Sequence, residues 1–600
     1  MQASTFYRNK LVGVEAELKL LQKKLNRNTL LRLISFLAIF LFLFGLAQLN
    51  LYLAITLSVL SVIVFGFLVK NHIYLQQLKK HKQAEANILE NELDAINYVF
   101  TSFRAGDEYI NTQHRFSHDL DLFGNGSLFQ MINRSVTQSG ELNLAKHLSV
   151  EQTIGAEVRK MQQAVQELSE NPDLLIYFRS TGSLSGITFE DKKLIHEWRN
   201  EPLYIAGKNW INIIRYLFPG FTLLSLLFLI ITGAGASVFT SLFVINLMLS
   251  GRFYKATTKE HNKLSAFLKV FGRYKDLLAI FERQTFKSEI LKKLLVETAQ
   301  GEHSAANSLE KLTKAGNAFD NRLNLVAGIF LQGLFLYDYH CLVKIEKWRK
   351  TYGRHLPVWL QNIAQFDSYV SLATFAYNNS DFVYPEPVDT LVLRAEEMGH
   401  PFIPASVRVP NNFELIAKGE FAIITGANMA GKSTFLRTVG INLVLAMSGL
   451  PVCAKNFEFT PRKIFSSMRT SDSLNENESY FYAELKRLKQ LIDRLKEEED
   501  LFILLDEILK GTNSVDKQKG SQLALEKILK LKGTGIIATH DLALTDMEKS
   551  FPNQIKNQCF EIEIEKAKIE FDYKLYDGVT KNMNAMLLME QMGIIEKPES

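Results

Sequence analysis

The feature that most constrains the fold of this chain is an uncharged, apolar stretch of 37 residues, Leu33–Val69. As a single α-helix it would extend about 55 Å, nearly twice the hydrocarbon core of a bilayer, which is about 30 Å thick. Gln48 and Asn50 divide the stretch into two segments, at about residues 30–47 and 51–69. Each segment has the length that a membrane helix needs. The sequence therefore predicts a transmembrane helical hairpin with a tight turn.

Basic residues flank this hairpin on both sides. Those that precede and follow it most closely are Lys23, Lys24, Arg27, Arg32, Lys70, Lys79, Lys80 and Lys82. Because basic flanks stay on the cytoplasmic side of a membrane, we expect the turn to face outward and the soluble parts to be cytoplasmic. A cleaved signal peptide would be shorter and would begin earlier. We therefore expect a multi-pass protein of the cell (inner) membrane.

A second uncharged stretch extends from Tyr216 to Gly251, with Gly233 and Gly235 near its middle. Arg215 and Arg252 border it, and it predicts another transmembrane hairpin. Each half has only about 16 or 17 residues, which is short for a membrane span. A buried helical hairpin of a soluble domain therefore remains the alternative for this stretch.

Apolar side chains recur before the first hairpin at alternating spacings of three and four: Leu11, Val14, Leu18, Leu21 and Leu25. This spacing predicts an amphipathic helix that packs on another helix and continues the hairpin inward. Its partner would be the helical pattern at residues 75–96, although ordinary amphipathic packing explains that pattern equally well.

Composition adds few constraints. A chain of 600 residues is expected to form several domains. Its 69 basic and 64 acidic side chains nearly balance, so the net charge indicates no polyanionic partner. Cys341, Cys453 and Cys559 lie far apart, without the spacing of metal ligands or of a disulfide framework. This cysteine pattern fits a reducing, cytoplasmic setting.

A nucleotide-binding motif lies in the last third of the chain. The apolar run 421–425 predicts a buried strand, and it leads into Gly426-Ala-Asn-Met-Ala-Gly-Lys-Ser433, which has the pattern G-x-x-x-x-G-K-[ST]. Such a P-loop wraps backbone N–H groups around phosphates, and the helix that follows directs its positive end at the same anion. We expect the lysine to reach the β and γ phosphates of ATP and the serine to bind Mg²⁺. The predicted cofactor-binding residues of this motif are Gly426, Ala427, Asn428, Met429, Ala430, Gly431, Lys432, Ser433 and Thr434.

Two further predicted strands end in polar residues. The apolar run 501–505 is followed by Asp506 and Glu507, and the run 534–539 is followed by His540. Because doubly wound sheets bind ligands at the carboxyl ends of their strands, we expect these side chains beside the P-loop. Asp506 is predicted to hold Mg²⁺ together with the P-loop serine. As catalytic residues, Glu507 is predicted to orient or deprotonate the attacking water, and His540 to respond to the γ-phosphate.

The P-loop segment from Thr425 to Arg437, with Asn-Met inside the loop, resembles the ATPase domain of MutS, the DNA mismatch-repair family. Other similar segments follow the family's order: Gly399-His400-Pro401, Glu478-Ser479-Tyr-Phe481 with Glu484, Asp506 to Ser514, and Ala538-Thr-His540. The resemblance implies an ABC-type P-loop ATPase that works as a homodimer, in which a signature segment of one subunit completes the nucleotide site of the other. Ser479 is the matching cofactor-binding residue here. Its alternative role is the N-cap of a helix over residues 480–495.

The resemblance to MutS continues upstream of the P-loop. Leu120 to Thr137 and Gln163 to Leu168 resemble the family's helical core domain, and Phe366 to Ala373 resembles the end of that domain. The family's mismatch-reading module has no counterpart before residue 115. Residues 171–362 are too few for the family's long levers and DNA clamp once the second hairpin is subtracted. We therefore expect a MutS-like protein that lacks the mismatch-reading domain.

These segments together predict a multidomain α + α/β protein with transmembrane helical hairpins, an all-α MutS-like core and a C-terminal P-loop NTPase domain. Hairpin 2 divides the core in the sequence. The expected divisions are an amphipathic N-terminal helix at 1–29, transmembrane hairpin 1 at 30–70, the core at 71–210 and 253–395, transmembrane hairpin 2 at 211–252, and the ATPase domain at 396–600.

The resemblance implies a Mg²⁺-dependent ATP hydrolase whose nucleotide state controls DNA binding, related to mismatch repair or to recognition of a DNA structure. A basic cluster at 344–354 would contact phosphates, although such clusters are usually a solvated helix face. One alternative is an ATP-driven switch that acts on an unidentified membrane or repair partner without binding DNA. Another is an ABC-type transporter. Transport is disfavoured because the predicted spans contain no charged residue and no Leu-Ser-Gly-Gly-Gln signature lies between Lys432 and Asp506.

Overall fold

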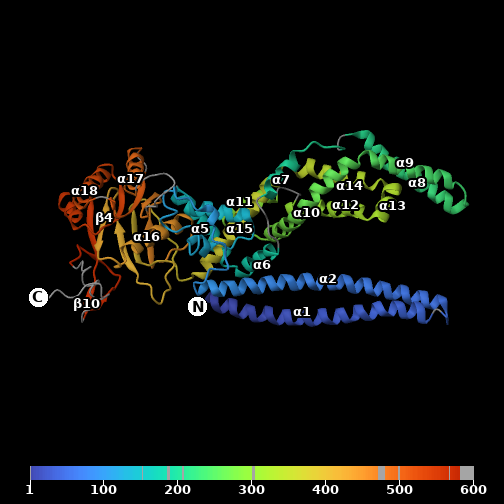
Figure 1. Ribbon diagram of the computed structural model, residues 1–600, viewed down its shortest axis with the longest axis horizontal. Helices are drawn as coiled ribbons and strands as arrows, with labels where there is room; N and C mark the ends of the chain where they lie inside the picture. Colours follow the sequence, from blue (N-terminus) through green and yellow to red (C-terminus); the bar gives the residue numbers. More distant parts are fainter. Residues whose placement is uncertain are drawn as a thin grey trace.

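The computed structural model describes residues 2–46, 48–151, 153–184, 190–205, 208–299, 304–469, 480–497, 500–511, 513–565 and 568–581. The molecule is elongated (Figure 1), with β-sheets near the C-terminus at one end, a helical middle, and long helices that extend to the other end. This arrangement confirms the expected combination of helical and α/β parts in one chain.

The first arm of the molecule is a pair of long antiparallel helices. Helix α1 spans Gln2–Phe40, a π-helical turn, η1, spans Leu41–Gly45, and α2 spans Leu51–Ile96. The side chain of Asn50 accepts a hydrogen bond of 3.1 Å from the backbone N–H of Leu53 and so caps α2. The chain therefore turns at the polar break that the sequence indicates.

The two halves of this arm differ in what they bury. In the half nearer the helical middle, α1 and α2 pack through Leu21, Leu25 and Leu75, and through Val14 and Leu89. In the outer half, most of the large apolar side chains are exposed. The segment at 75–96 is therefore the partner of the amphipathic N-terminal helix. The apolar outer half has no such cover among the described residues.

The described part of the middle contains helices and loops but no strand, and α15 runs through its centre with most of its side chains buried. The elements are η2 Asp107–Tyr109, α3 Leu128–Ile132, α4 Gln138–Leu148, α5 Gly155–Ser169, α6 Pro172–Ser183, α7 Glu190–Asn200, α10 Tyr254–Glu282, α11 Glu289–Thr298, α12 Ala305–Phe319, α14 Tyr337–Tyr352 and α15 Leu356–Asn378. The carboxylate of Asp367 in α15 accepts hydrogen bonds from the N–H and hydroxyl of Thr137, at 2.8 and 2.7 Å. These bonds fix the start of α4 against α15.

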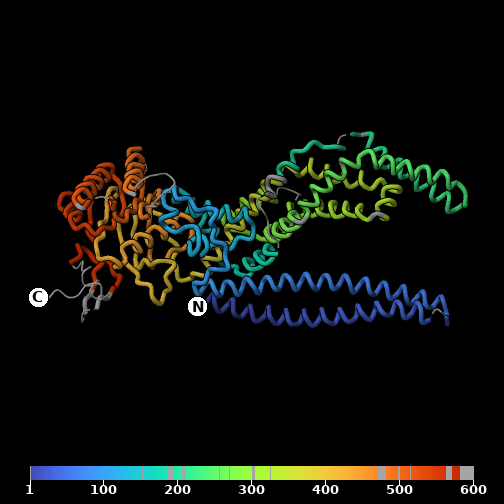
Figure 2. Tube along the Cα trace, in the orientation of Figure 1, coloured from blue at the N-terminus to red at the C-terminus, as the bar shows by residue number. Residues whose placement is uncertain are grey.

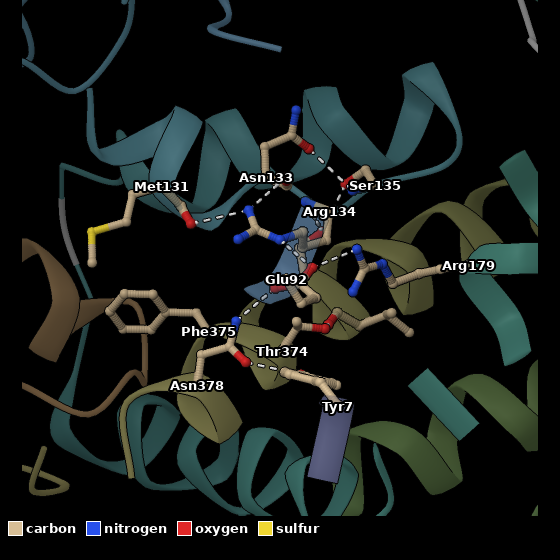
Figure 3. Close-up of polar contacts among 12 residues, drawn as sticks. Tyr7, Glu92, Met131, Asn133, Arg134, Ser135, Arg179, Thr374, Phe375 and Asn378 are labelled. Carbon is tan, nitrogen blue, oxygen red and sulfur yellow. Dashed lines mark hydrogen bonds and ion pairs between the residues drawn. The ribbon is translucent and has the colours of Figure 1, made fainter. Parts of the chain in front are cut away.

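A buried polar cluster joins the first arm to this helical middle (Figure 3). Glu92 of α2 is fully buried and accepts hydrogen bonds from Arg134 at 2.7 Å, Arg179 at 2.5 Å and Asn378 at 2.7 Å. The hydroxyl of Tyr7 in α1 donates to Asn378 at 2.8 Å. Burial alone would raise the pKa of Glu92, but the two guanidinium groups lower it to about 2. The carboxylate therefore stays charged and holds the base of both arm helices.

The second arm is the hairpin of α8, Asn209–Thr232, and α9, Ala236–Arg252. Gly233 and Gly235 adopt φ angles of 69° and 85°, which glycine tolerates best, and they form its turn. Many apolar side chains on both helices are exposed. The hairpin is therefore not buried inside the helical middle, which was the alternative that its short halves left open. Figure 2 shows both arms reaching the same end of the molecule, away from the sheets.

Another apolar helix, α13 (Leu325–Phe335), follows the short helix η3 (Asp320–Leu323). It packs on α8 and α9 of the second arm. The sequence analysis did not anticipate it. Three described helices are long and apolar enough to span a membrane, within Gln2–Gly45, Leu51–Ile96 and Trp210–Thr232. Helices α9 and α13 reach that length and composition only together with the helix after each, across bends of 66° and 79°.

The described part of the C-terminal region contains a six-stranded, a four-stranded and a two-stranded sheet. The six-stranded sheet has the order β12-β9-β4-β8-β7-β6, in which only β12 is antiparallel to its neighbour. Its strands are β4 Phe421–Gly426, β6 Lys463–Ser467, β7 Leu501–Asp506, β8 Thr534–Ala538, β9 Ile555–Phe560 and β12 Leu575–Asp577. A smaller sheet contains β1 Glu386–Pro387, β5 Asn456–Phe459, β2 Leu393–Met398 and β3 Asn411–Leu415, and β10 Glu563–Glu565 pairs with β11 Lys568–Glu570.

Helices cover both faces of the six-stranded sheet. Successive side chains of a strand point to opposite faces, and since most of them are buried here, both faces must be covered. In β4, Ala422 and Ile424 belong to the core that includes α16, whereas Phe421 and Ile423 belong to the core that includes α17 and α18. The helices of this region are α16 Lys432–Met447, α17 Tyr480–Lys496, α18 Ser514–Lys530, η4 Leu542–Asp546 and α19 Met547–Ser550. The result is a doubly wound sheet with its strand ends free to form a site.

Candidate nucleotide-binding site

Three neighbouring parallel strands end at one edge of the large sheet. Strand β8 lies between β4 and β7, so the segments that follow all three strands converge. They border a cavity of about 640 Å³. Among the sequence-predicted residues, those that line it are Asn428, Met429, Gly431, Lys432, Ser433, Thr434, Asp506, Glu507 and His540. One cavity therefore collects side chains that lie more than a hundred positions apart in the sequence.

The P-loop backbone takes the shape that its glycines permit. Gly426 and Gly431 have φ angles of 152° and 105°, and α16 begins at Lys432. A Cβ atom at Gly426 would lie 2.8 Å from the carbonyl oxygen of Phe560, so a side chain there would force β4 and β9 apart. The first N–H groups of a helix have no partner within it. At the start of α16 they are therefore available to an anion in the cavity.

Lys432 is buried at the base of this loop. Its ammonium group donates to the carbonyl oxygens of Gly426 and Ala427, both at 2.9 Å, and lies 3.1 Å from Nε2 of His540. Burial lowers the pKa of Lys432 to about 8, although the carboxylates of Asp506 and Glu507 act in the opposite direction. A phosphate in the cavity would favour the charged form and raise that pKa again.

The two carboxylates occupy different positions at the end of β7. Asp506 is the last residue of the strand, whereas Glu507 has a φ of 53°, which is costly for a residue with a side chain. The N–H of Glu507 donates to the carbonyl oxygen of Ala538 at 2.9 Å. Its carboxylate lies 3.7 Å from Nε2 of His540 and 3.8 Å from the amine of Lys517. The backbone therefore holds Glu507 toward the histidine.

His540 is held close to neutral charge by its surroundings. Burial lowers its pKa first, and the positive charge of Lys432 lowers it further, while Glu507 raises it. A neutral imidazole has one nitrogen that donates and one that accepts a hydrogen bond. Here Nε2 lies within hydrogen-bonding distance of the ammonium of Lys432, and the carboxylate of Glu507 is 3.7 Å from the same nitrogen.

The donor set suits magnesium bound together with phosphate. The hydroxyl of Ser433 and the carboxylate of Asp506 line the same cavity. Within the described ranges, no group of three or more His, Cys, Asp and Glu side chains is arranged to hold a metal ion by itself. Mg²⁺ commonly binds through one or two protein oxygens together with substrate phosphates and water. The residues present fit that mode of binding.

Phe435 and Thr438 of α16 also line the cavity, and the rest of its wall comes from residues that the sequence analysis did not assign to the site: Met398, His400, Ile403, Val407, Arg408, Val409, Asn411, Lys510, Phe560 and Tyr573. Tyr573 lies over the P-loop, 3.3 Å from the Cβ position of Gly431, and its carbonyl oxygen accepts a hydrogen bond of 3.0 Å from Asn411. This wall is largely apolar and aromatic. The Gly399-His400-Pro401 segment was the one available signal for it.

Comparison of the sequence with known protein families shows what this site is similar to. The family described as MutS domain V matches residues 422–597, which include the P-loop, both carboxylates and His540. The C-terminal region of this chain is therefore similar to the ATPase domain of MutS proteins.

Individual MutS relatives are moderately similar and longer. "MutS protein homolog 4" of Homo sapiens is 30% identical over 260 residues, which cover 42% of this chain and 26% of that protein. "DNA mismatch repair protein MutS" of Thermotoga sp. (strain RQ2) is 30% identical over 232 residues, 38% of this chain and 29% of that protein. "Endonuclease MutS2" of Thermotoga neapolitana is 29% identical over 234 residues, 39% of this chain and 30% of that protein. The matched part thus spans between a quarter and a third of these MutS relatives.

Some residues of the MutS-like pattern lie away from the cavity. Gly426, Ala427 and Ala430 shape the P-loop but do not line the cavity, and Ser479 falls outside the described residues. Helix α17 begins directly after that serine, and the carboxylate of Glu484 accepts a hydrogen bond of 3.3 Å from the N–H of Gly511. The start of α17 is therefore attached to the loop that follows Glu507.

The MutS-like site is connected directly to the helical middle. Arg437 of the P-loop helix pairs with Asp121 at 3.1 Å, and the neighbouring Leu120 lies against Gly440 in the same helix. Asp119 accepts hydrogen bonds from the hydroxyl of Ser466 at 2.6 Å and from the N–H of Arg469 at 3.0 Å. A displacement of α16 or β6 would therefore be transmitted to the segment that leads into α3.

Proposed function

We propose that this chain is a membrane-anchored, Mg²⁺-dependent ATPase of the MutS type. The observation that carries the proposal is the convergence of Lys432, Asp506, Glu507 and His540 on one cavity beside a P-loop. The match to MutS domain V supports ATP as the nucleotide. The adenine base would pack against apolar and aromatic side chains of the cavity wall, such as Ile403 and Tyr573.

The residues of the site take distinct roles in this proposal. The P-loop N–H groups and Lys432 hold the β and γ phosphates, and Ser433 and Asp506 hold Mg²⁺. Bound Mg²⁺ supplies charge stabilisation for the phosphoryl group that is transferred. Glu507 orients and deprotonates the attacking water. His540, being neutral, accepts or donates a hydrogen bond according to whether the γ-phosphate is present.

The active form in this proposal is a homodimer through the C-terminal domains. Ser479 of one subunit would complete the nucleotide site of the other, as in the MutS pattern that its segment resembles. The hydrogen bond from Gly511 to Glu484 supports this, because it connects α17, which follows Ser479 in the sequence, to the loop after Glu507. ATP would then favour the closed dimer, and hydrolysis would release it.

The two arms would anchor the protein in the cell membrane, with the transmembrane hairpins at about 30–70 and 211–252. Their exposed apolar surfaces and their location at one end of the molecule support this proposal (Figure 1). The helical core and the ATPase domain, at about 396–600, would remain on the cytoplasmic side. The basic flanks of the first hairpin favour that orientation.

ATP binding would control the contact of the helical core with DNA, in a role related to mismatch repair. A second candidate function is an ATP-driven membrane switch that does not bind DNA. The connection from the P-loop helix through Arg437 and Asp121 to the helical middle favours it, since that middle also holds both arms. In either case the ATPase cycle would move the elements around α15.

ATP turnover and DNA affinity of the solubilised full chain separate the two functions. Wild type and Glu507→Ala are compared with homoduplex, mismatched and branched DNA across a salt series. We expect Glu507→Ala to retain ATP binding and to lose hydrolysis. Nucleotide-dependent DNA binding supports the MutS-type role, whereas turnover without DNA binding at low salt supports the membrane switch. Failure of the wild type to hydrolyse ATP would overturn both.

A further inference from the structure

Helix α13 exposes an apolar face that no described element covers. Val326 and Phe330 are 65% and 57% exposed, and Leu323 and Ile329 are exposed beside them. The segment from residue 323 to 337 contains no charged side chain. A contiguous apolar face of this kind marks contact with a partner or with lipid.

Side-chain contacts place α13 beside the inner half of α9. Asn246 donates to the carbonyl oxygen of Gly333 at 2.8 Å, and the hydroxyl of Ser250 donates to the amide oxygen of Gln332 at 3.0 Å. The rings of Phe243 and Phe330 have centroids 6.3 Å apart. The exposed face of α13 is therefore continuous with the exposed apolar surface of the second arm.

Aromatic side chains mark the base of this arm. Trp210, Tyr216 and Tyr254 are exposed there, and the guanidinium group of Arg322 lies 5.5 Å from the ring of Tyr254. Tryptophan and tyrosine concentrate at the level of lipid headgroups. Phe243 lies nine residues before the end of α9 at Arg252, a distance of about 14 Å along that helix. The part of α13 near Phe243 would thus lie below that level.

The charged groups closest to α13 are paired with each other. Arg322 precedes the helix and Asp338 follows it, and their side chains form a buried ion pair of 3.1 Å. The amide of Gln332 donates to the same carboxylate at 2.5 Å. Charges beside hydrocarbon require this kind of compensation. The pairing therefore fits a helix that enters lipid and returns.

We propose that α13 is a half-span that lies among the acyl chains of the cytoplasmic leaflet beside α8 and α9. Its 11 residues extend about 16 Å, roughly half of a hydrocarbon core. Leu336, with a φ of 49°, ends the helix and directs the chain into α14, which returns to the helical middle. This inference rests on the proposed membrane anchoring by α8 and α9. It adds a helix that links the leaflet directly to the core.

Quenching by lipids tests the location of α13. Phe330→Cys and Val326→Cys are each labelled with an environment-sensitive fluorophore in full-length protein reconstituted into vesicles that carry a quencher at a shallow or a deep acyl position. Leu224→Cys, 63% exposed on α8, reports the hairpin, and Leu523→Cys, 57% exposed on α18, reports water. The native cysteines are buried, so the parent protein serves as the unlabelled control.

We expect the lipid quenchers to reduce emission from both α13 labels, and from Leu224→Cys, at least about twofold more than from Leu523→Cys. If the α13 labels match Leu523→Cys while Leu224→Cys is quenched, α13 lies outside the membrane and the inference is wrong, although the anchor stands. If the α13 labels are shielded from aqueous and lipid quenchers alike, a second copy covers them, which also overturns it. If Leu224→Cys is unquenched too, the membrane anchor fails together with the inference.

Discussion

The two ends of this molecule differ in which groups are buried and which are exposed. At the sheet end, the ammonium of Lys432 is buried beside two carboxylates and a histidine, around a cavity. At the arm end, apolar side chains of α1, α2, α8, α9 and α13 face outward, and the charges near them are paired. Buried polar groups need partners, and exposed apolar faces need cover. The proposed function accounts for this difference with a polar ligand at one end and lipid at the other.

The arms also differ in how they join the helical middle. The first arm is held by a charged cluster around Glu92, whereas α9 of the second arm leads into α10, and α13 leads into α14, with only one residue between each pair. The first joint combines this charged cluster with apolar packing around Tyr7, Ile88 and Ile176, whereas the second depends on chain continuity and apolar packing. Substitutions at the two joints are therefore expected to differ in size and in pH dependence.

The largest effect is expected at the nucleotide end. Lys432→Ala removes the buried charge that faces the phosphates, and we expect ATP hydrolysis to fall about a thousandfold. Steady-state phosphate release measures it. Lys530→Ala, on the exposed face of α18, is the matched control and should retain wild-type activity. If Lys432→Ala retains half of the activity, the site assignment is wrong.

The charged joint of the first arm comes next. Glu92→Gln leaves Arg134 and Arg179 without a counter-charge, and we expect a loss of about 3 kcal/mol in the free energy of unfolding at neutral pH. The pKa of Glu92 is lowered to about 2 from an ordinary 4.5, so its stabilisation is complete above pH 4.5 and is lost as the pH falls toward 2. The difference between wild type and variant should therefore shrink over that range.

Denaturant unfolding at a series of pH values, followed by tryptophan fluorescence, measures this difference. Glu526→Gln, which breaks an exposed ion pair with Lys530, should give no pH-dependent difference of comparable size. A Glu92→Gln penalty that stays constant from pH 6 to pH 2 would show that the cluster contributes packing rather than charge.

A charge placed on the second arm tests the apolar end. Leu224→Arg puts a guanidinium at the middle of α8, and we expect insertion of the hairpin to become less favourable by about 2.5 kcal/mol. The fraction that resists carbonate extraction from membranes measures insertion. Leu523→Arg on α18 should leave that fraction unchanged. Equal extraction of the two variants would argue against a membrane location for α8.

The smallest effect is expected for the polar contact inside the second arm. Asn246→Leu removes the hydrogen bonds to Thr222 and Gly333, and we expect a loss of about 1 kcal/mol in the stability of the α8–α9–α13 unit. Thr240→Val removes a hydrogen bond made only within α9 and serves as the control. Thermal unfolding in detergent compares them. A larger loss for Thr240→Val would contradict the packing of α13 on α9.

The sequence predicted the parts of the site that follow from contiguous motifs or from strand ends. Lys432 lies in a loop whose pattern specifies its role, and Asp506 and His540 follow strands that a doubly wound sheet must place beside that loop. Asn411 and Tyr573 were missed because they lie far apart in the chain, at the start of β3 and before β12, and meet only through the fold. No spacing rule connects them.

The fold of the two helical arms was also predicted only in part. Hydropathy located both hairpins because each stretch is long and uncharged. Helix α13 was missed because its 11 residues are too few for a span. The joint at Glu92 brings together positions as far apart as Glu92 and Asn378, and only the tertiary structure shows that one carboxylate serves Arg134 and Arg179 together.

The central claim is that one chain carries a MutS-type ATPase on a membrane anchor. Flotation of reconstituted vesicles after a carbonate wash, with ATP hydrolysis measured across the gradient, tests it most directly. We predict that the activity floats with the vesicles, and that Lys432→Ala protein floats equally without hydrolysing ATP. Active protein that remains in the dense, lipid-free fractions would contradict the claim.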